Sequence, residues 1–457
     1  MGHLLVDDER MVTAPGPVGR PLVGSLPDLA PPLTRMQTIL GWTRRYGEVV
    51  RVRLGSRVNY VLTSPTAIKH VLLDNAKNYP KSPAYDTLKA LLGDGLLTAS
   101  GQTWLTNRRM IQPYFHQKYI AGLLPTMVAC TETLLADWQG RAARGEVVDV
   151  SAQMMALALR VVSKTLLSAD VTGTEAGVGE ALATGLELAN ARIFAPFQIP
   201  EWLPTPNNRR FVHARGVLDG VVLGIIRARR ATPGQGDLLD MLLAARDEET
   251  GDGLSDHQVR DEVMTIFLAG HETTATALTW TLYLLSRHPD VARKLRAEVA
   301  AVLGDRVPTL EDLGKLRYTT MVLEEAMRLY PPIYVIQRQA LADDVVDGFT
   351  IKAGELVTAN MFATHRNPKY WENPEGFDPE RFAPENSADR PKFAYLPFGG
   401  GGRVCIGNNF AMMEGKVLLA MICRAFHVDA LPGQPVVPWP VVTLRVKDGL
   451  QATLRAI

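Results

Sequence analysis

The sequence predicts a mainly α-helical fold with a minor β portion. Helical periodicity dominates most of the 457-residue chain, and one predicted helix is unusually long. Short strand-like runs beside turn signals occur near the N-terminus and between residues 333 and 360. Length alone suggests about three domains. No composition shift, repeat or low-complexity segment marks a boundary, however, so we expect residues 1–457 to form a single domain.

The predicted elements follow in chain order. Residues 1–32 form an N-terminal arm, in which the proline- and glycine-rich stretch 15–32 is expected to be extended along the surface rather than helical. Strands are expected at 49–54 and 59–62, around a Gly55-Ser56 turn. Helices are then expected at 66–73, 104–111, 125–144, 152–167 and 209–229. The C-terminal part is expected to hold a helix at 316–329, short strands within 333–360, an irregular stretch at 366–398, a helix at 408–426 and a strand at 441–446.

The longest predicted helix begins at Ser255, which forms a capping box with Gln258, and ends before Pro289. Its length of about 33 residues corresponds to about 50 Å, enough to cross a whole domain. The apolar run from 264 to 285 is also long enough to span a bilayer. Because His271 and Glu272 lie near its middle, where lipid disfavours ionisable groups, we expect a helix buried in protein and no membrane span.

Composition excludes several classes of protein. The chain has 49 Lys and Arg against 48 Asp and Glu, a net charge of +1, which argues against a dedicated nucleic-acid binder. The N-terminus lacks the basic and apolar regions of a secretory signal. Only three widely spaced cysteines occur, Cys130, Cys405 and Cys423, so a disulfide framework is not expected. This sparse use of cysteine indicates that the protein is located in a reducing cytoplasm.

The segment around Cys405, F-G-G-G-G-R-V-C-I-G-N-N-F, is the most unusual in the chain. Four successive glycines cost conformational entropy, but they allow a tight loop whose backbone closely approaches a neighbouring atom. Cys405 precedes a predicted helix N-terminus, which favours an anion, so we expect a lowered thiol pKa. The spacing fits neither a Walker loop nor G-x-G-x-x-G. Cys130 and Cys423 lie on apolar helix faces and are expected in the core.

Five positions of this segment match the pattern F-x-x-G-x-R-x-C-x-G, and with it the chain resembles the cytochrome P450 family. They are Phe398, Gly401, Arg403, Cys405 and Gly407. The resemblance implies the cytochrome P450 fold, with haem b held between the long helix and the cysteine loop. It also implies that the Cys405 thiolate is an axial ligand of the haem iron. Phe398 would shield the thiolate, and Arg403 would pair with a haem propionate.

Further matches to the family lie elsewhere in the chain. Glu325 and Arg328 form an E-x-x-R pair on one helix face, and Arg381 in F-D-P-E-R-F resembles the third member of a structural cluster. Trp104 and Arg108, four residues apart, resemble a clamp on a propionate.

Arg338 resembles another propionate ligand. An exposed strand arginine is the alternative for this residue.

The long helix carries the segment A-G-H-E-T-T at residues 269–274. A zinc-protease motif fails because residue 275 is alanine rather than histidine. The resemblance implies a locally widened helical turn over the iron. It further implies that Ala269 and Gly270 leave room for dioxygen and that Glu272 and Thr273 conduct protons. His271 is interpreted as a polar partner rather than a ligand.

The substrate pocket is expected to be apolar. Helical spacing places four pocket residues on one helix face, namely Ile266, Ala269, Gly270 and Thr273. The resemblance implies that the opposite wall is formed by Ile333, Val335 and Ile336. Segments 81–101 and 193–200 are expected to cover the entrance. An apolar pocket indicates a lipophilic substrate, such as a terpenoid, steroid, fatty acid or macrolide.

The function implied is a haem-thiolate monooxygenase that uses O₂ and acts as a cytoplasmic monomer. Because no reductase module is expected within the chain, electrons would come from a ferredoxin and its NAD(P)H-dependent reductase. A basic patch of Arg108, Arg109, His116, Lys118 and Lys416 is either a docking site for this donor or an ordinary solvated face. A haem-thiolate peroxygenase or isomerase and a non-catalytic haem-binding sensor are the alternative functions.

Overall fold

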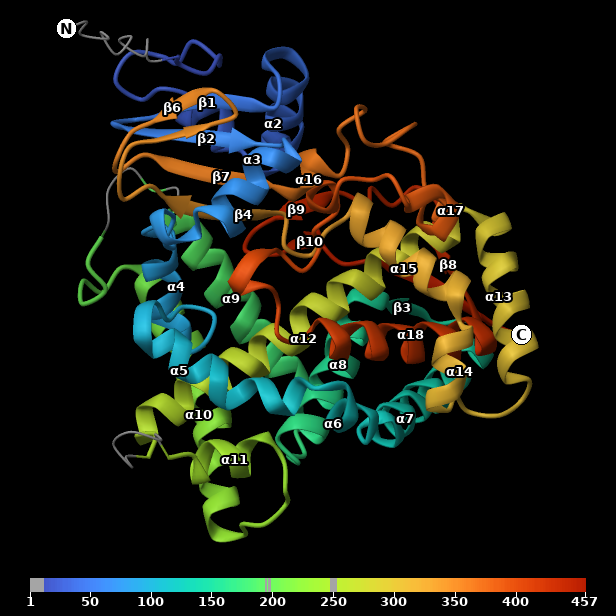
Figure 1. Ribbon diagram of the computed structural model, residues 1–457. Coiled ribbons are helices and arrows are strands. Elements are labelled where there is room, and N and C mark those ends of the chain that lie inside the picture. The colour runs from blue at the N-terminus through green and yellow to red at the C-terminus, as the bar shows by residue number, and fades with distance from the viewer. Residues whose placement is uncertain (1–11, 194, 196–198, 247–252) are drawn as a thin grey trace, which may run out of the picture. The chain divides into compact units, whose positions relative to one another are not determined.

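The computed structural model describes residues 12–193, 195, 199–246 and 253–457 (Figure 1). Expectations for residues 1–11, 194, 196–198 and 247–252 lie outside the described residues. The chain divides into two compact units. The first contains the described residues up to Ser82 together with Val335–Trp371 and Pro391–Val404, and the second contains Pro83–Tyr334, Glu372–Arg390 and Cys405–Ile457.

The first unit combines a small sheet with short helices. Its strands are β1 (Val49–Leu54), β2 (Arg57–Leu62), β4 (Val335–Gln339), β5 (Asp344–Val346), β6 (Phe349–Ile351) and β7 (Leu356–Asn360). Its α-helices are α1 (Leu26–Leu29), α2 (Pro32–Tyr46), α3 (Pro65–Lys69) and α16 (Met361–Thr364). A π-helical turn, η1 (His70–Asp74), and the 3-10 turns η2 (Ala76–Asn78), η5 (Lys392–Ala394) and η6 (Gly401–Arg403) complete it.

The sheet of the first unit has the strand order β1-β2-β7-β4, and only the β2–β7 pair is parallel. β5 and β6 form a separate hairpin. The N-terminal arm lies along β1: the Arg51 N–H donates to Pro15 O at 2.9 Å, and the Ser25 N–H donates to Arg53 O at 2.7 Å. The prediction that the arm contains no helix is wrong at Leu26–Leu29, where Pro27 occupies the first helical turn, a position in which proline removes no helical hydrogen bond.

The second unit is mostly helical. Its longer helices are α4 (Ala84–Leu92), α5 (Gly101–Ile111), α7 (Leu124–Ala143), α8 (Val150–Leu166), α9 (Glu175–Ile193), α10 (Pro206–Ala231), α12 (Asp256–Arg287), α13 (Pro289–Leu303), α15 (Arg317–Leu329) and α18 (Asn408–Ala425). Its short helices and 3-10 turns are η3 (Gln112–Phe115), α6 (Gln117–Ala121), α11 (Leu238–Ala244), α14 (Leu310–Lys315), η4 (Pro379–Phe382) and α17 (Pro384–Ser387). The sheet β3-β11-β8 and the pair β9-β10 are built from β3 (Val147–Asp149), β8 (Phe426–Ala430), β9 (Pro438–Pro440), β10 (Leu444–Val446) and β11 (Gln451–Ala456).

Helix α12 forms the centre of the second unit and packs against α8, α10, α15 and α18 (Figure 1). Ser255 accepts the Gln258 N–H, and the Gln258 side chain accepts the Ser255 N–H, so the predicted capping box is confirmed. Most side chains of α12 are buried, because neighbours cover it on nearly every side. The helix is α-helical throughout, so the widened turn implied at residues 269–274 is absent.

Several short helices and four longer ones were not anticipated from the sequence; the longer ones are α2, α4, α9 and α13. Helix α4 (Ala84–Leu92) lies inside the segment 81–101 that was expected to cover the entrance of the pocket, and for which no helix was predicted. Its buried leucines, Leu88, Leu91 and Leu92, recur at helical spacing over too short a window to stand out. Helix α9 contains three glycines that weaken its helical pattern, and tertiary packing compensates.

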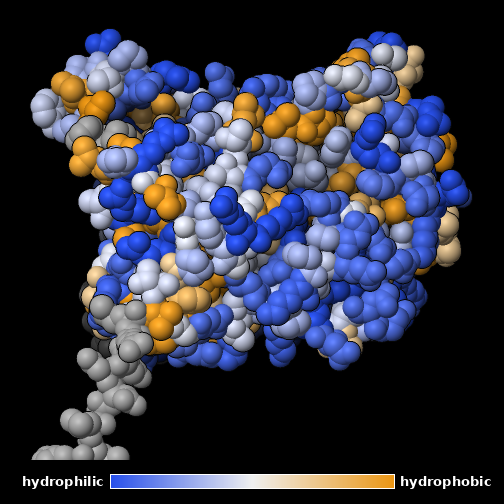
Figure 2. Space-filling view, turned by 90° about the horizontal axis from the view of Figure 1, so that it is seen from above, coloured by the Kyte–Doolittle hydropathy of each residue, from blue (hydrophilic) through white to orange (hydrophobic). Residues whose placement is uncertain are grey.

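No helix among the described residues is both long and apolar enough to cross a membrane. On the face shown in Figure 2, hydrophobic side chains form small, separated patches among hydrophilic ones.

Candidate active site

One stripe of the central helix α12 is less buried at its middle than the rest of the helix. Ala269 is exposed and Thr273 is half-buried, although most residues around them on the helix are buried. Ile266, one turn before Ala269, is buried on the same face. The Thr273 hydroxyl donates to Ala269 O at 2.8 Å. This stripe therefore presents a small methyl group and one hydroxyl, which suits an apolar pocket with a single polar contact.

Gly270 does not belong to this stripe. A Cβ at this position would lie 2.6 Å from Val162 Cγ2 on α8. Its missing side chain therefore allows α12 and α8 to pack closely, rather than leaving room in a pocket as the sequence indicated.

Glu272 points away from the stripe into a buried polar cluster. Its Oε1 accepts from the Arg445 Nε at 2.7 Å and from the Thr443 hydroxyl at 2.5 Å. The Arg445 Nη2 lies 2.6 Å from the same oxygen, and Glu272 is 1% exposed. The carboxylate is therefore held by a charge pair, which compensates part of the cost of its burial.

Sequence reasoning missed Thr443 and Arg445. Arg445 lies on β10, and Thr443 is the residue before this strand. Their i, i+2 spacing in V-V-T-L-R-V places them on one side of an extended segment, where two polar groups need a partner. That pattern is the signal by which they could have been found.

His271 lies on the buried side of α12. Its Nδ1–H donates to Phe267 O at 2.6 Å, and among the described residues its Nε2 has no hydrogen-bond partner. Burial lowers the pKa of His271, so the ring is neutral at pH 7. The His271 ring is therefore a neutral polar side chain packed in the protein core beside α12.

Cys405 is the exposed cysteine, whereas Cys130 and Cys423 are buried. Although Cys405 is exposed, protein surrounds its sulfur closely enough that desolvation raises the pKa of the thiol. The Gly407 N–H and the Arg108 charge both favour the thiolate but do not outweigh burial. The expectation of a lowered pKa is therefore wrong for the protein alone. A metal ion that binds the sulfur would displace the proton.

The glycine loop before Cys405 belongs to the first unit and packs closely there. A Cβ on Gly401 would lie 1.8 Å from Leu72 O, and its φ is +69°. Gly399 also has a positive φ, of +73°. Any other residue at position 401 would displace the backbone of η1.

Four side chains were predicted to bind haem propionates. Arg338 on β4 is 8% exposed and donates to Gln337 O at 3.0 Å, so the alternative of an exposed strand arginine does not apply. Arg403 in η6 is half-buried, as are Trp104 and Arg108 on α5. Trp104 and Arg108 share one face of α5, and Arg108 carries the charge that acts on Cys405.

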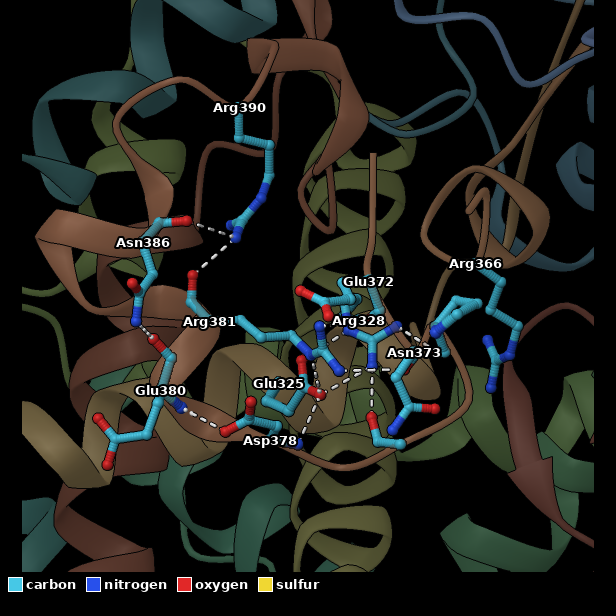
Figure 3. A network of polar contacts seen from close by, with 12 residues as sticks. Glu325, Arg328, Arg366, Glu372, Asn373, Asp378, Glu380, Arg381, Asn386 and Arg390 are labelled. Carbon is cyan, nitrogen blue, oxygen red and sulfur yellow. Dashed lines mark hydrogen bonds and ion pairs between the residues drawn. The ribbon is translucent and has the colours of Figure 1, made fainter. Parts of the chain in front are cut away.

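Glu325, Arg328 and Arg381 form a cluster in the second unit (Figure 3). Arg328 donates to both oxygens of Glu325, at 2.6 and 2.7 Å, and to the carbonyls of Pro374 and Gly376. The Arg381 Nε lies 3.4 Å from Glu325 Oε1. Glu325 and Arg328 are fully buried, so this cluster ties α15 to the segment that contains η4. Its burial in the core fits a role in stabilising the fold.

The other predicted residues are placed as follows. Ile333, Val335 and Ile336 are each half-buried, and so is Phe398. In the predicted basic patch, Arg109, His116 and Lys118 are exposed, but Lys416 is not a free surface cation. It donates to Leu313 O at 3.2 Å, and burial lowers its pKa.

Comparison with known proteins gives a consistent result. The model of the cytochrome P450 family matches residues 14–445. The chain is 37% identical to cyclooctat-9-en-7-ol 5-monooxygenase of Streptomyces melanosporofaciens over 425 residues, covering 92% of this chain and 90% of that protein. It is 35% identical to cyclooctatin synthase of the same organism (95% and 94% covered), and 34% identical to the chloroplastic protein LUTEIN DEFICIENT 5 of Arabidopsis thaliana (90% and 72% covered). A crystal structure of the cytochrome P450DA heme domain superimposes with a TM-score of 0.88 at 29% identity, covering 98% of each chain.

Proposed function

Because this chain belongs to the cytochrome P450 family of haem-dependent, oxygen-incorporating enzymes, we propose that it inserts one oxygen atom from O₂ into a lipophilic small molecule. The observation that carries the proposal is the single accessible cysteine beside a tightly packed glycine loop, in a chain whose central helix exposes a methyl and a hydroxyl.

The donor set fits a haem. Among the described residues, no group of three or more His, Cys, Asp or Glu side chains could hold a metal ion. Haem would supply the other ligands of an iron bound at Cys405 from its own macrocycle, so the protein needs to provide only the cysteine. When bound, the haem supplies the oxygen activation and oxygen transfer.

The protein residues supply ligation, charge and protons in this proposal. Cys405 binds the iron, and the Gly407 N–H stabilises the negative charge on its sulfur. Trp104, Arg108, Arg338 and Arg403 hold the propionates, for which arginine provides bidentate donors. The Thr273 hydroxyl faces the substrate side of α12 and delivers protons. Glu272, the preceding residue, is the buried acid of this pair and is held by Arg445.

The substrate is expected to be a terpenoid, steroid, fatty acid or macrolide. The name of the relative cyclooctat-9-en-7-ol 5-monooxygenase describes a cyclic, unsaturated alcohol. A cyclic hydrocarbon skeleton with few polar groups also suits a helix face built from Ile266, Ala269 and Thr273. We therefore place cyclic terpenoids and steroids first.

Electrons come, in this proposal, from a ferredoxin and its NAD(P)H-dependent reductase. Arg109, His116 and Lys118 form an exposed basic surface that would attract an acidic donor. The reduction rate should then fall as ionic strength rises, because salt screens exposed charges. Sparse cysteine usage, with all three cysteines free, supports a reducing, cytoplasmic compartment.

Replacing the iron ligand tests the proposal. We expect Cys405→Ala to lose the thiolate-type spectrum of the ferrous–CO complex, whereas Cys130→Ala, which removes a buried cysteine, keeps it. A Cys405→Ala protein that retains this spectrum contradicts the assignment. Turnover of a terpenoid and steroid panel with NAD(P)H, ferredoxin and reductase separates the monooxygenase from a peroxygenase, an isomerase or a sensor.

A further inference from the structure

The loop between α4 and α5 lies directly against the first turns of α12. A Cβ on Gly93 would overlap the Asp261 carboxyl group, and a Cβ on Gly95 would lie 2.5 Å from the Asp261 backbone oxygen. The Asp94 N–H donates to Asp261 Oδ2 at 2.7 Å. Two glycines therefore permit a contact between loop and helix backbone that other residues would prevent.

Glu262, the next residue on α12, forms hydrogen bonds that hold the same loop. It is 1% exposed. Its Oε2 accepts the Leu96 N–H at 3.0 Å, and its Oε1 accepts from the Asn107 side chain on α5. One carboxyl group thus holds both the loop and the helix that follows it.

Glu262 also lies on the face of α12 that the proposed function assigns to the substrate. Residues 262, 266, 269 and 273 follow the helical spacing i, i+4, i+7 and i+11, so they form one stripe. Glu262 begins this stripe, about 16 Å before Thr273. The loop that it holds therefore lies at the N-terminal end of the stripe.

We propose that Glu262 is a positioning residue of the substrate site, whose carboxyl group pins the loop of residues 93–99 over the N-terminal end of the substrate-facing stripe. This inference rests on the proposed function, because that function makes the stripe a substrate surface. The loop then controls how easily a bulky molecule reaches the stripe, whereas the chemistry occurs farther along α12.

The charges around Glu262 give this contact a distinctive pH dependence. Burial raises the pKa of Glu262 to about 7, Asp261 and Asp94 add to the rise, and the Leu96 N–H and Asn107 oppose it. Neighbouring charged groups pair with one another: Arg260 with Asp219 of α10 and with Asp261, and Lys89 of α4 with Asp94.

The sign of the effect follows from proton linkage. Opening the loop would hydrate Glu262 and return its pKa toward 4.5, so the closed loop binds the proton more tightly than the open loop. Closure is therefore favoured most below pH 4.5, and this advantage is lost as the pH rises through about 7. We expect the loop to open more readily at pH 8 than at pH 5.5.

Hydrogen exchange of the holoenzyme measures the loop directly. After correction for intrinsic rates, amides 93–99 should exchange faster at pH 8 than at pH 5.5. Glu262→Gln, which copies the neutral carboxyl group, should remove this pH dependence and keep the slow exchange. Glu262→Ala should exchange about tenfold faster at both pH values, because both hydrogen bonds are lost. Asp256→Asn, an exposed site at the start of α12, is the matched control and should leave the wild-type pattern unchanged.

Two results would overturn the contact itself: wild-type pH dependence in Glu262→Gln, or unaltered exchange in Glu262→Ala.

Access to the site is tested with two iron-binding probes of different size, 4-phenylimidazole and cyanide. Glu262→Ala should speed association of 4-phenylimidazole about tenfold and leave cyanide unchanged, since only the bulky probe needs the loop to move. Equal rates for 4-phenylimidazole in both proteins would contradict a role at the substrate site. A wild-type protein with no spectral response to either probe would instead overturn the proposed function, and the exchange experiment would still report on the loop.

Discussion

At the scale of single residues, neighbouring positions on α12 have opposite environments. Thr273 faces outward beside the exposed Ala269, whereas Glu272, one residue earlier, is buried against Arg445. A rotation of about 100° per residue separates the two side chains on the helix. The hydroxyl therefore contacts whatever occupies the stripe, and the carboxylate is held behind it.

Removing the Thr273 hydroxyl tests its proposed role in proton delivery. Thr273→Ala should continue to consume electrons but form roughly tenfold less product per electron, because a positioned proton-transfer group is lost. The ratio of product to NAD(P)H consumed measures this. Thr279→Ala is the matched control, because the Thr279 hydroxyl makes the same bond to a carbonyl four residues earlier, at 2.8 Å, but is buried. Unchanged coupling in Thr273→Ala would remove the hydroxyl from the mechanism.

At the scale of elements, the contact between α12 and α8 depends on a glycine. Gly270→Ala should destabilise the protein by about 1–3 kcal/mol, because its Cβ would meet Val162 at 2.6 Å in a closely packed core. The denaturant midpoint of the holoenzyme measures the loss. Adding Val162→Ala should recover part of it, as a double-mutant cycle would show.

Gly220→Ala on α10 provides the control for this substitution. A Cβ there meets nothing within 4 Å, so alanine should stabilise the helix by about 0.5–1 kcal/mol. A loss of stability in both variants would show that the cost lies in the helix backbone and not in the contact with α8.

The elements also show where sequence reasoning succeeds and where it ends. The start of α12 was predicted because Ser255 and Gln258 act within one turn, and such local signals are visible in sequence. The role of Gly270 was misread because its reason, Val162, lies about a hundred residues away in the chain. Arg445 was missed for the same reason: its partner Glu272 is distant in sequence.

At the scale of the whole molecule, the buried cluster around Glu325 links segments that are distant in sequence (Figure 3). Arg328→Ala should lower stability by about 3–5 kcal/mol, because it leaves the Glu325 carboxylate buried without its main partner. Thermal unfolding of the holoenzyme measures this. Arg328→Lys should recover only part of the loss, since an ammonium group cannot reproduce the paired guanidinium contacts. Equal stability of wild type and Arg328→Ala would contradict a structural role for the cluster.

Glu414 on α18 links stability to pH across the whole molecule. It is fully buried, and neither of its oxygens forms a hydrogen bond of normal geometry with any described residue, although Thr274 on α12 lies close enough to favour the charged form. Burial raises the pKa of Glu414 to about 8, so the folded protein holds a neutral acid at pH 7. The group therefore contributes its full stability below pH 4.5 and loses it as the pH rises through about 8.

Glu414→Gln should remove this dependence. The free energy of unfolding of the wild type should fall relative to that of the variant by about 2–4 kcal/mol between pH 4.5 and pH 8.5. Burial also raises the pKa values of Glu262 and Glu324 to about 7, but these groups are present in both proteins, so the difference isolates Glu414. Denaturant unfolding at a series of pH values measures it. Parallel curves for the two proteins would mean that Glu414 has a similar pKa in the folded and unfolded states, and that the core around α18 admits enough water to solvate a charge.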